Sequence, residues 1–443
     1  MNKPLYYILI LTLLLTACQN QSDNKPLLSK SKKKQPIFIV NPNRHLNIAE
    51  FWIDQIDSPD KIIMNQREIR RFNREVVRKG SRYAFSSINN YYSSSWIKGR
   101  VVKNFKNMKQ KAKYYHDDEK IPSAFYKEIQ KTMNLNGFHS KKVKTRYALT
   151  INYSDQKLIP TEESLLKKRH QIYFDRNQNS ALDIGTPIAI LHTSIDGDWH
   201  YGVSLNSSGW VHDSDIAFGE RDEIEGYLTS KKFVITTSAK TALLFNGHYH
   251  DYFRMGVRLP LISQGESQTT ILVPTRDHTG ELTFTNGTIN NSDVHLGYLP
   301  YTSRTILTQA FKFLHLPYGW GGMYGEQDCS KFIQEIYATT GVKLPRNSSA
   351  QSQVGTIKKE LRALKKEARE KTLESWLIPG VSILHLKGHI VLYIGLYRDK
   401  PYIIQTVWGN SKRHFALGRT AVNSLDFNDY FMKIDRVTNI TTH

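Results

Sequence analysis

The hydrophobic pattern changes along the chain and divides its 443 residues into segments of different structural class. From about 37 to 140 the pattern is mainly helical. Short runs rich in β-forming residues, separated by turn residues, follow over 143–220 and again over 230–299. The segment 300–443 opens with a helical pattern and ends in strands. We therefore expect a multidomain protein with a helical N-terminal domain, two small β-barrels and a C-terminal α+β domain.

Local signals support the helical segment. The run from Asn65 to Glu68 resembles a capping box, and the apolar residues that follow it fall on one helical face, namely Ile69, Phe72 and Val76. The stretches Tyr83–Trp96 and Ala124–Met133 predict further short helices. Later in the chain, residues 356–375 have apolar side chains at helical spacing with Lys and Arg between them, which predicts an amphipathic helix.

The N-terminus has the layout of a secretory signal over 1–17, with Lys3 followed by an apolar stretch too short for a membrane span. Leu15-Thr-Ala-Cys18 resembles a bacterial lipobox, in which Cys18 becomes the lipidated first residue. The alternative is a cleaved signal with an incidental cysteine. Residue 19 is Gln rather than Asp, which favours the outer membrane, facing the periplasm, in a cell with two membranes. Residues 18–36 are expected to form a polar, lipidated tether.

The chain contains only two cysteines, which excludes a disulfide framework and a Cys-rich zinc site. The second, Cys329, follows a glycine-rich stretch and opens a predicted helix whose apolar residues are Phe332, Ile333, Ile336 and Tyr337. Unpaired N–H groups and the helix dipole stabilise negative charge at a helix N-terminus. We therefore expect Cys329 to be a reactive thiolate, although a buried cysteine is more often inert packing.

A nucleophilic cysteine needs a base and a group that orients the base. His389 stands at the first position of a predicted strand that ends near Gly395. The next predicted strand carries Gln405 among apolar or small residues, and a buried amide there must find a hydrogen-bond partner. A neighbouring imidazole N–H would satisfy it.

These residues carry a family resemblance. Asp328-Cys-Ser330, Gly388-His389 and the polar residue in the following strand resemble the catalytic motifs of NlpC/p60 cysteine peptidases, and so do the flanks at 317–322 and 344–351. Further upstream, 174–178 and Gly209-Trp-Val211 resemble the first of two bacterial SH3-like domains in one multidomain branch of that family. The helical region resembles the N-terminal domain of the same branch.

The resemblance implies a papain-like C-terminal domain that hydrolyses the γ-D-glutamyl bond to a diamino acid, such as meso-diaminopimelate, in peptidoglycan stem peptides. Carried over to this chain, Cys329 is the nucleophile and His389 the base. Gln405 stands where histidine is most common, and its amide oxygen can accept the imidazole N–H. Tyr318 lies where a hydroxyl is expected near the oxyanion.

The resemblance also implies that Asp328 and Ser330 bind the free L-alanine amine of the substrate. An acidic group from the first SH3-like domain usually helps, and Asp175 is the candidate here; the alternative is a turn aspartate that binds its own backbone. A tyrosine is often found before the Gly-Trp pair of that domain, where this chain has Ser208. Trp210 or Tyr201 would then form an aromatic wall, unless these rings belong to the core.

The formal net charge is +21, and residues 1–150 hold 29 basic and 11 acidic side chains, a difference of 18. A secretory signal argues against nucleic acid, and anionic wall and membrane are the expected partners. No metal or organic cofactor is expected, and the protein is expected to be a monomer. Two alternatives stay open: a wall-binding lipoprotein with an inactive peptidase domain, and acyl transfer by the same thiolate.

Overall fold

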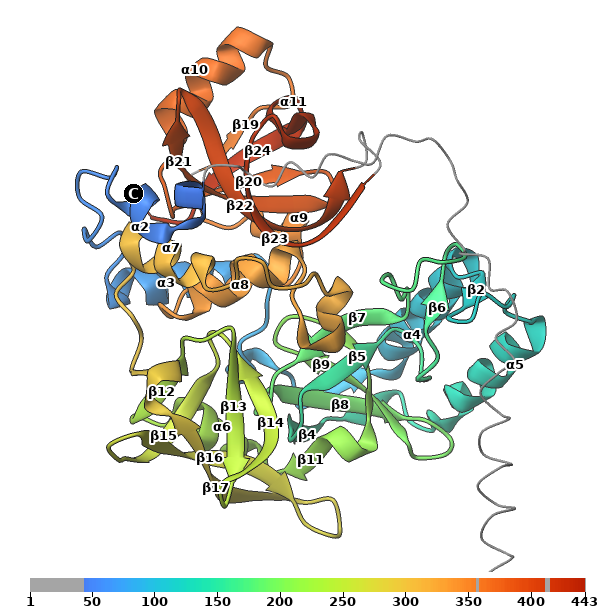
Figure 1. The fold of residues 1–443 in the computed structure, drawn as a ribbon. Coiled ribbons are helices and arrows are strands. Elements are labelled where there is room, and N and C mark those ends of the chain that lie inside the picture. Colours follow the sequence, from blue (N-terminus) through green and yellow to red (C-terminus); the bar gives the residue numbers. More distant parts are fainter. Residues whose placement is uncertain (1–43, 356–357, 411–414, 443) are drawn as a thin grey trace, which may run out of the picture. The chain divides into compact units, whose positions relative to one another are not determined.

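The computed structural model describes residues 44–355, 358–410 and 415–442 (Figure 1). Cys18, and with it the predicted signal peptide and tether, lies outside the described residues. Within the described part of the chain, no helix combines the length and the apolar character that a membrane span needs.

The N-terminal helices α2 (Ala49–Ile53) and α3 (Gln66–Arg78) share a hydrophobic core with the C-terminal domain. α3 begins at the predicted capping box, in which the side chain of Asn65 accepts from the first turn. Trp52 and Phe72 are fully buried in this core. These helices therefore form part of the C-terminal domain's structure.

The helices α4 (Ser94–Lys111) and α5 (Ser123–Thr132) belong to a different core, which they share with the first β-rich segment. The structure thus differs from the predicted single helical domain over 37–140, because each amphipathic helix buries its apolar face against a different sheet. The stretch Tyr83–Trp96 is also not a helix. It contains a short 3-10 turn and the strand β1 (Tyr91–Ser93) before α4 starts.

The first β-rich segment forms an antiparallel sheet with the strand order β11-β4-β8-β9-β10-β5-β7. Its strands are β4 (Arg146–Thr150), β5 (Ser154–Lys157), β7 (Gln178–Leu182), β8 (Pro187–Thr193), β9 (Trp199–Ser204), β10 (Ser208–His212) and β11 (Ile216–Gly219). Short strand pairs join it to the helical segment, with β1 next to β3 (Lys142–Lys144) and β2 (Tyr114–Tyr115) next to β6 (Leu165–Leu166).

The helix α6 (Arg221–Thr229) leads into a second sheet with the strand order β14-β13-β17-β16-β15-β12-β18. Its strands are β12 (Phe233–Thr236), β13 (Lys240–Phe245), β14 (His248–Arg254), β15 (Arg258–Gln264), β16 (Gln268–Arg276), β17 (Leu282–Asn290) and β18 (Val294–Leu296). Both β-rich segments were expected from the sequence. It stays a prediction that the second segment is an SH3-like barrel.

The C-terminal domain packs helices against a sheet with the strand order β19-β24-β20-β21-β22-β23. The strands are β19 (Lys358–Glu360), β20 (Ser382–Leu386), β21 (His389–Tyr397), β22 (Lys400–Asn410), β23 (Phe415–Ser424) and β24 (Ile434–Asn439). The helices are α7 (Ser303–Phe311), α8 (Cys329–Ala338), α9 (Ser348–Gln351), α10 (Lys366–Trp376) and α11 (Tyr430–Lys433). This is the expected α+β arrangement.

The predicted amphipathic helix over 356–375 is wrong in its first half. Residues 356 and 357 lie outside the described residues, Lys358–Glu360 pair with β24 as a strand, and the helix α10 starts at Lys366. Strand pairing at the sheet edge satisfies the backbone there, which outweighs the helical spacing of the side chains.

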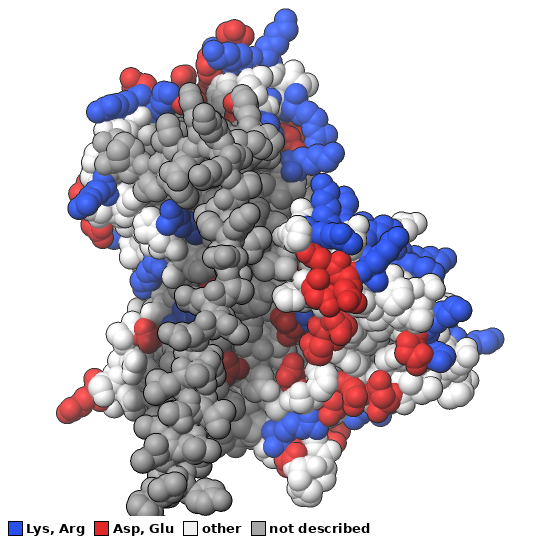
Figure 2. All heavy atoms as spheres, turned by 45° about the vertical axis from the view of Figure 1, so that its right-hand side comes forward, with Lys and Arg blue, Asp and Glu red and all other residues white. Residues whose placement is uncertain are grey.

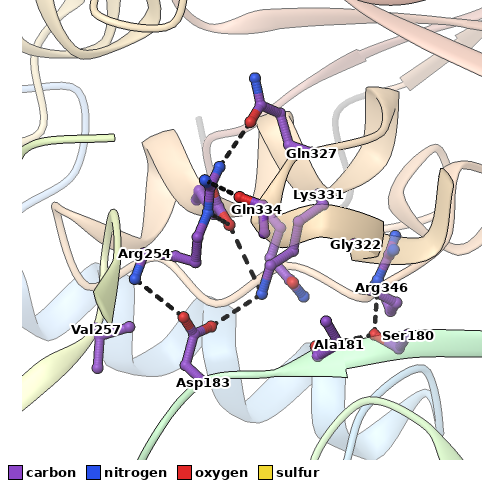
Figure 3. A network of polar contacts seen from close by, with 12 residues as sticks. Ser180, Ala181, Asp183, Arg254, Val257, Gly322, Gln327, Lys331, Gln334 and Arg346 are labelled. Carbon is purple, nitrogen blue, oxygen red and sulfur yellow. Dashed lines mark hydrogen bonds and ion pairs between the residues drawn. The ribbon is translucent and has the colours of Figure 1, made fainter. Parts of the chain in front are cut away.

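Buried charges connect the two sheets to α8 (Figure 3). Arg254 at the end of β14 is fully buried and forms an ion pair with Glu335, with 3.2 Å between Nη2 and Oε2. Lys331 Nζ lies 3.1 Å from Asp183 Oδ2 of the first β-rich segment. Since a buried charge is costly unless paired, these contacts hold α8 against both sheets.

Candidate active site

Cys329 is the first residue of α8, and the preceding loop has a shape that only glycine allows. The N-cap is Asp328, whose side chain accepts from the backbone N–H groups of Ser330 and Lys331. In the loop, Gly321 and Gly322 have φ values of 63° and 96°, and a Cβ added at Gly322 would lie 2.6 Å from Ala181 Cβ. The loop can therefore pack closely against β7 and present Cys329 at the helix end.

His389 is the first residue of β21, as predicted, and Gln405 faces it from the neighbouring strand β22. The distance between His389 Nε2 and Gln405 Oε1 is 2.7 Å. An amide oxygen only accepts, so His389 Nε2 carries the hydrogen and Nδ1 is left as the basic nitrogen. Gln405 in turn donates from Nε2 to Asn423 Oδ1 at 2.9 Å, so Asn423 on β23 orients the amide.

The protonation states differ from the expected thiolate. Burial, with the negative charge of Asp328, raises the pKa of Cys329 to about 12, against the backbone N–H of Ile390 and the charge of Arg346. Burial also lowers the pKa of His389 from its ordinary value. Desolvation thus outweighs the helix dipole, and the resting pair is a neutral thiol and a neutral imidazole.

Asp328 is engaged by protein donors on both carboxylate oxygens. Arg346 approaches it in a bidentate way, with Nη2 at 2.7 Å from Oδ2 and Nη1 at 3.0 Å from Oδ1. Oδ2 also accepts from Gly321 N at 3.2 Å, and Oδ1 accepts from the hydroxyl and the N–H of Ser330. Its pKa is lowered because the charge and hydrogen bonds of Arg346 outweigh burial. Asp328 is therefore a carboxylate that organises the start of α8.

Tyr318 lies at the mouth of the glycine-rich loop. Burial raises the pKa of its phenol far above the ordinary value, and the negative charge that Cys329 would carry adds to this shift. Its hydroxyl therefore stays protonated and can donate a hydrogen bond next to the cysteine. That this hydroxyl binds the oxyanion stays a prediction.

A cleft of about 610 Å³ opens beside Cys329. Tyr318, Asp328, Cys329, Ser330 and Gly388 line it from the C-terminal domain. Trp320, Arg346 and Ser348 line it as well, and the rest of the wall comes from α4 and the first β-rich segment. Three parts of the chain that are distant in sequence thus form one site.

Known proteins match both the C-terminal domain and the first sheet. The sequence model of the NlpC/P60 family matches residues 315–412, and that of an SH3 domain of the SH3b1 type matches residues 165–212. The chain thus contains an NlpC/P60 domain and an SH3-like domain. The structure is similar to that of an NlpC/P60 endopeptidase from Photobacterium damselae subsp. piscicida, with a TM-score of 0.74, 22% identity, and coverage of 88% of this chain and 96% of that one.

Two further matches come from Bacillus cereus. One is a gamma-D-glutamyl-L-lysine dipeptidyl-peptidase, 29% identical over 152 residues, which are 33% of this chain and 44% of the relative. The chain thus matches less than half the length of this curated relative. The other is the solved structure of an NlpC/P60 family protein, with a TM-score of 0.45, 20% identity, and coverage of 59% and 82% of the two chains.

The structure does not bring Asp175 to the cleft, so its predicted role in binding a free amine is wrong. The side chain is fully buried, and Oδ1 accepts from the backbone N–H groups of Leu165 and Asn177 at 2.9 and 2.7 Å. Lys157 Nζ lies 3.6 Å from its other oxygen. Asp175 is the turn aspartate of the alternative interpretation.

The predicted aromatic wall is also wrong. Trp210 and Tyr201 are both fully buried, and their rings pack edge to face in the core shared with α4 and α5. Ser208, by contrast, lines the cleft, and its hydroxyl accepts from Arg100 Nη2 at 3.2 Å. β10 points Trp210 and Ser208 to the same side, but Trp210 lies deeper, under the helices.

Several residues of the cleft were not predicted from the sequence. Arg346 follows Pro345 in the stretch that supported the family resemblance. A buried Asp328 needs a positively charged partner, and this requirement could have identified Arg346. Arg176, next to Asp175, reaches the cleft and lies over the ring of Trp320 at 5.2 Å. No motif in the sequence of α4 indicates that this helix forms part of the site.

Among the described residues, no three His, Cys, Asp or Glu side chains gather as metal ligands would.

Proposed function

We propose that this protein is a cell-wall cysteine peptidase that hydrolyses the γ-D-glutamyl bond to a diamino acid, such as meso-diaminopimelate, in peptidoglycan stem peptides. The observation that carries the proposal is that Cys329 lines the cleft and lies against the backbone N–H of Ile390, the residue after His389, whose ring is held by Gln405. The NlpC/P60 family supports cysteine peptidase chemistry. The named activity of the Bacillus cereus relative supports a γ-D-glutamyl bond.

The reaction begins with a proton transfer, because both members of the resting pair are neutral. As the thiol attacks the carbonyl carbon, its proton passes to His389 Nδ1 and a carbon–sulfur bond forms. Nε2–H continues to donate to Gln405 Oε1, which holds the ring in the reactive tautomer. The hydroxyl of Tyr318 and the backbone N–H of Cys329 are the donors proposed for the oxyanion.

The tetrahedral intermediate collapses when the imidazolium gives its proton to the departing amine of the diamino acid. This leaves the glutamyl carbonyl as a thioester on Cys329 and restores the neutral imidazole. Water then attacks the thioester with His389 as the base, and the free acid leaves with the thiol regenerated. Gln405 cannot become charged, so it stabilises the transient imidazolium through its oxygen dipole alone.

We also propose that Cys18 is lipidated and anchors the protein to the periplasmic face of the outer membrane. The support is the sequence at 15–18 and the basic, polar stretch that follows it. Lipidation would restrict the enzyme to wall material near the membrane. Palmitate labelling of the expressed wild type and of Cys18→Ala tests this, and equal labelling of both would contradict it.

The enzymatic proposal is tested by mass spectrometry of muropeptide digests made with the wild type and with Cys329→Ala under reducing conditions. We expect new termini at γ-D-glutamate and at the diamino acid with the wild type only. Equal products with both proteins, or none with either, would exclude it. Binding to sacculi without any cleavage would instead support a wall-binding role, and products that form only with an added amine would support acyl transfer.

A further inference from the structure

The helix α4 supplies one wall of the cleft. The side chains Arg100, Asn104, Asn107 and Lys111 line it, and their spacing places them on one face of the helix. The adjacent face carries Ile97, Val101 and Phe105, which are buried in the core shared with the first sheet. The apolar face thus fixes the helix, and the polar face is presented to the site that contains Cys329.

The charges that line the cleft are unbalanced. Arg100, Lys111, Arg176 and Arg346 line it with a single carboxylate, Asp328. Arg346 and Asp328 neutralise each other through their bidentate pair. Among the described residues, no carboxylate lies within ion-pair distance of the other three cations. Figure 2, turned toward the side of α5 and β6, shows Lys and Arg side chains exposed on this face together with a group of carboxylates.

Two buried donors in the same wall lack acceptors. The Nε of Arg176 and the Nε1 of Trp320 are both buried without a hydrogen-bond partner, and the guanidinium lies over the indole at 5.2 Å. Buried polar groups are normally satisfied, so these two donors would stabilise an acceptor on a bound ligand. A carboxylate or an amide carbonyl satisfies both donors.

We propose that this cleft selects anionic peptides whose amino terminus is blocked by an acyl group, with α4 and Arg176 binding the carboxylates and the acyl carbonyl. This deepens the proposed function and rests on it. A free ammonium is repelled by Arg100, Lys111 and Arg176, and the oxygens of Asp328 are already taken by protein donors. Acylation removes that positive charge and adds a carbonyl acceptor.

The test compares two peptides that differ only at the amino terminus, L-Ala-γ-D-Glu-meso-diaminopimelate and its N-acetyl form. Their Kd values for the full-length Cys329→Ala protein are measured by calorimetry, and their kcat/KM values with the wild type by mass spectrometry. We expect the N-acetyl peptide to bind and to react at least about tenfold better. The preference should shrink at high salt, because screening weakens the repulsion.

A charge-reversal variant tests whether α4 causes the preference for the N-acetyl peptide. Arg100→Glu in the Cys329→Ala background is expected to weaken binding of the N-acetyl peptide about tenfold and to narrow the difference between the two peptides. The matched control is Lys106→Glu, which makes the same charge change at an exposed position of α4 that does not line the cleft. This control should leave both Kd values unchanged.

The possible outcomes separate the two proposals. Equal or tighter binding of the free-amine peptide, no binding of either peptide, or equal effects of Arg100→Glu and Lys106→Glu would overturn the inference. Cleavage of the free-amine peptide in preference would overturn it while leaving the peptidase function in place. Selective binding of the N-acetyl peptide without any cleavage would support the inference and overturn the peptidase function.

Discussion

Asn423 Oδ1 accepts a hydrogen bond from Gln405 Nε2 at 2.9 Å, and this contact determines which atom of the Gln405 amide faces His389. With the nitrogen held by Asn423, the oxygen is turned toward His389 Nε2, 2.7 Å away. A rotated amide would instead present its donors to the imidazole and favour the wrong tautomer. Asn423 is thus a positioning residue that acts through Gln405.

Replacement of this acceptor tests the role of Asn423. We expect Asn423→Leu to lower kcat about tenfold with little change in KM, because the Gln405 amide can then rotate while the cleft is unchanged. Asn423→Asp keeps an acceptor oxygen and should retain most of the activity. A purely structural role would lower the melting temperatures of both variants and leave the kcat of the folded protein alone.

The raised pKa of Cys329 predicts how the free enzyme reacts with an alkylating agent. Since its pKa is raised to about 12, the thiol is protonated at neutral pH, and the rate of iodoacetamide modification should still rise with pH above 9. Mass spectrometry of Cys329, with Cys329→Ala as the blank, gives this rate. A rate that is constant above pH 7 would indicate a thiolate–imidazolium pair instead.

The lowered pKa of His389 predicts the acid side of the activity profile. Burial disfavours the imidazolium, so the base stays neutral as the pH falls past the ordinary histidine value, about 6.5. The acid limb of kcat/KM should therefore lie below pH 6.5 and be absent above it. An acid limb centred above pH 6.5 would show that a neighbouring negative charge raises the pKa of His389 by more than burial lowers it.

Removal of one partner of the buried Arg254–Glu335 ion pair is expected to lower the free energy of unfolding strongly. Replacement of both partners by apolar residues is expected to lower it much less. Arg254→Ala leaves the carboxylate of Glu335 buried with only Lys331, at 3.7 Å, and should lower the free energy of unfolding by about 3–5 kcal/mol. The double variant Arg254→Met with Glu335→Leu should lose much less. Urea denaturation of the two variants gives the comparison, and equal losses would contradict the pairing argument.

Trp52 should matter for the peptidase domain although it precedes that domain by more than two hundred residues in the sequence. Its ring is fully buried beside Gly395 of β21, and its Nε1 donates to Leu46 O at 2.9 Å. Trp52→Ala is expected to lower the free energy of unfolding by about 3–5 kcal/mol. The exposed neighbour Ile48→Ala should change it by less than about 0.5 kcal/mol.

The features that the sequence predicted correctly are local ones. The helix that starts at Cys329, the strand that starts at His389 and the capping box at Asn65 each depend on residues within about ten positions. Side-chain periodicity and capping groups specify such elements wherever the rest of the chain lies. The pairing of His389 with Gln405 was also predictable, because neighbouring strands of an antiparallel sheet bring their residues together.

The sequence alone therefore determined the helix that starts at Cys329 and the strand that starts at His389, and the tertiary structure decided what surrounds them. Asp175 and Trp210 looked available for a substrate, but Asp175 is buried against backbone N–H groups and Trp210 is buried in the core shared with α4 and α5, so both have structural roles. The same packing places Arg100 in the cleft, more than two hundred residues before Cys329 in the chain. Such contacts depend on the sheet against which each amphipathic helix buries its apolar side chains. That packing is set by the free energy of the whole fold rather than by neighbouring residues in the sequence.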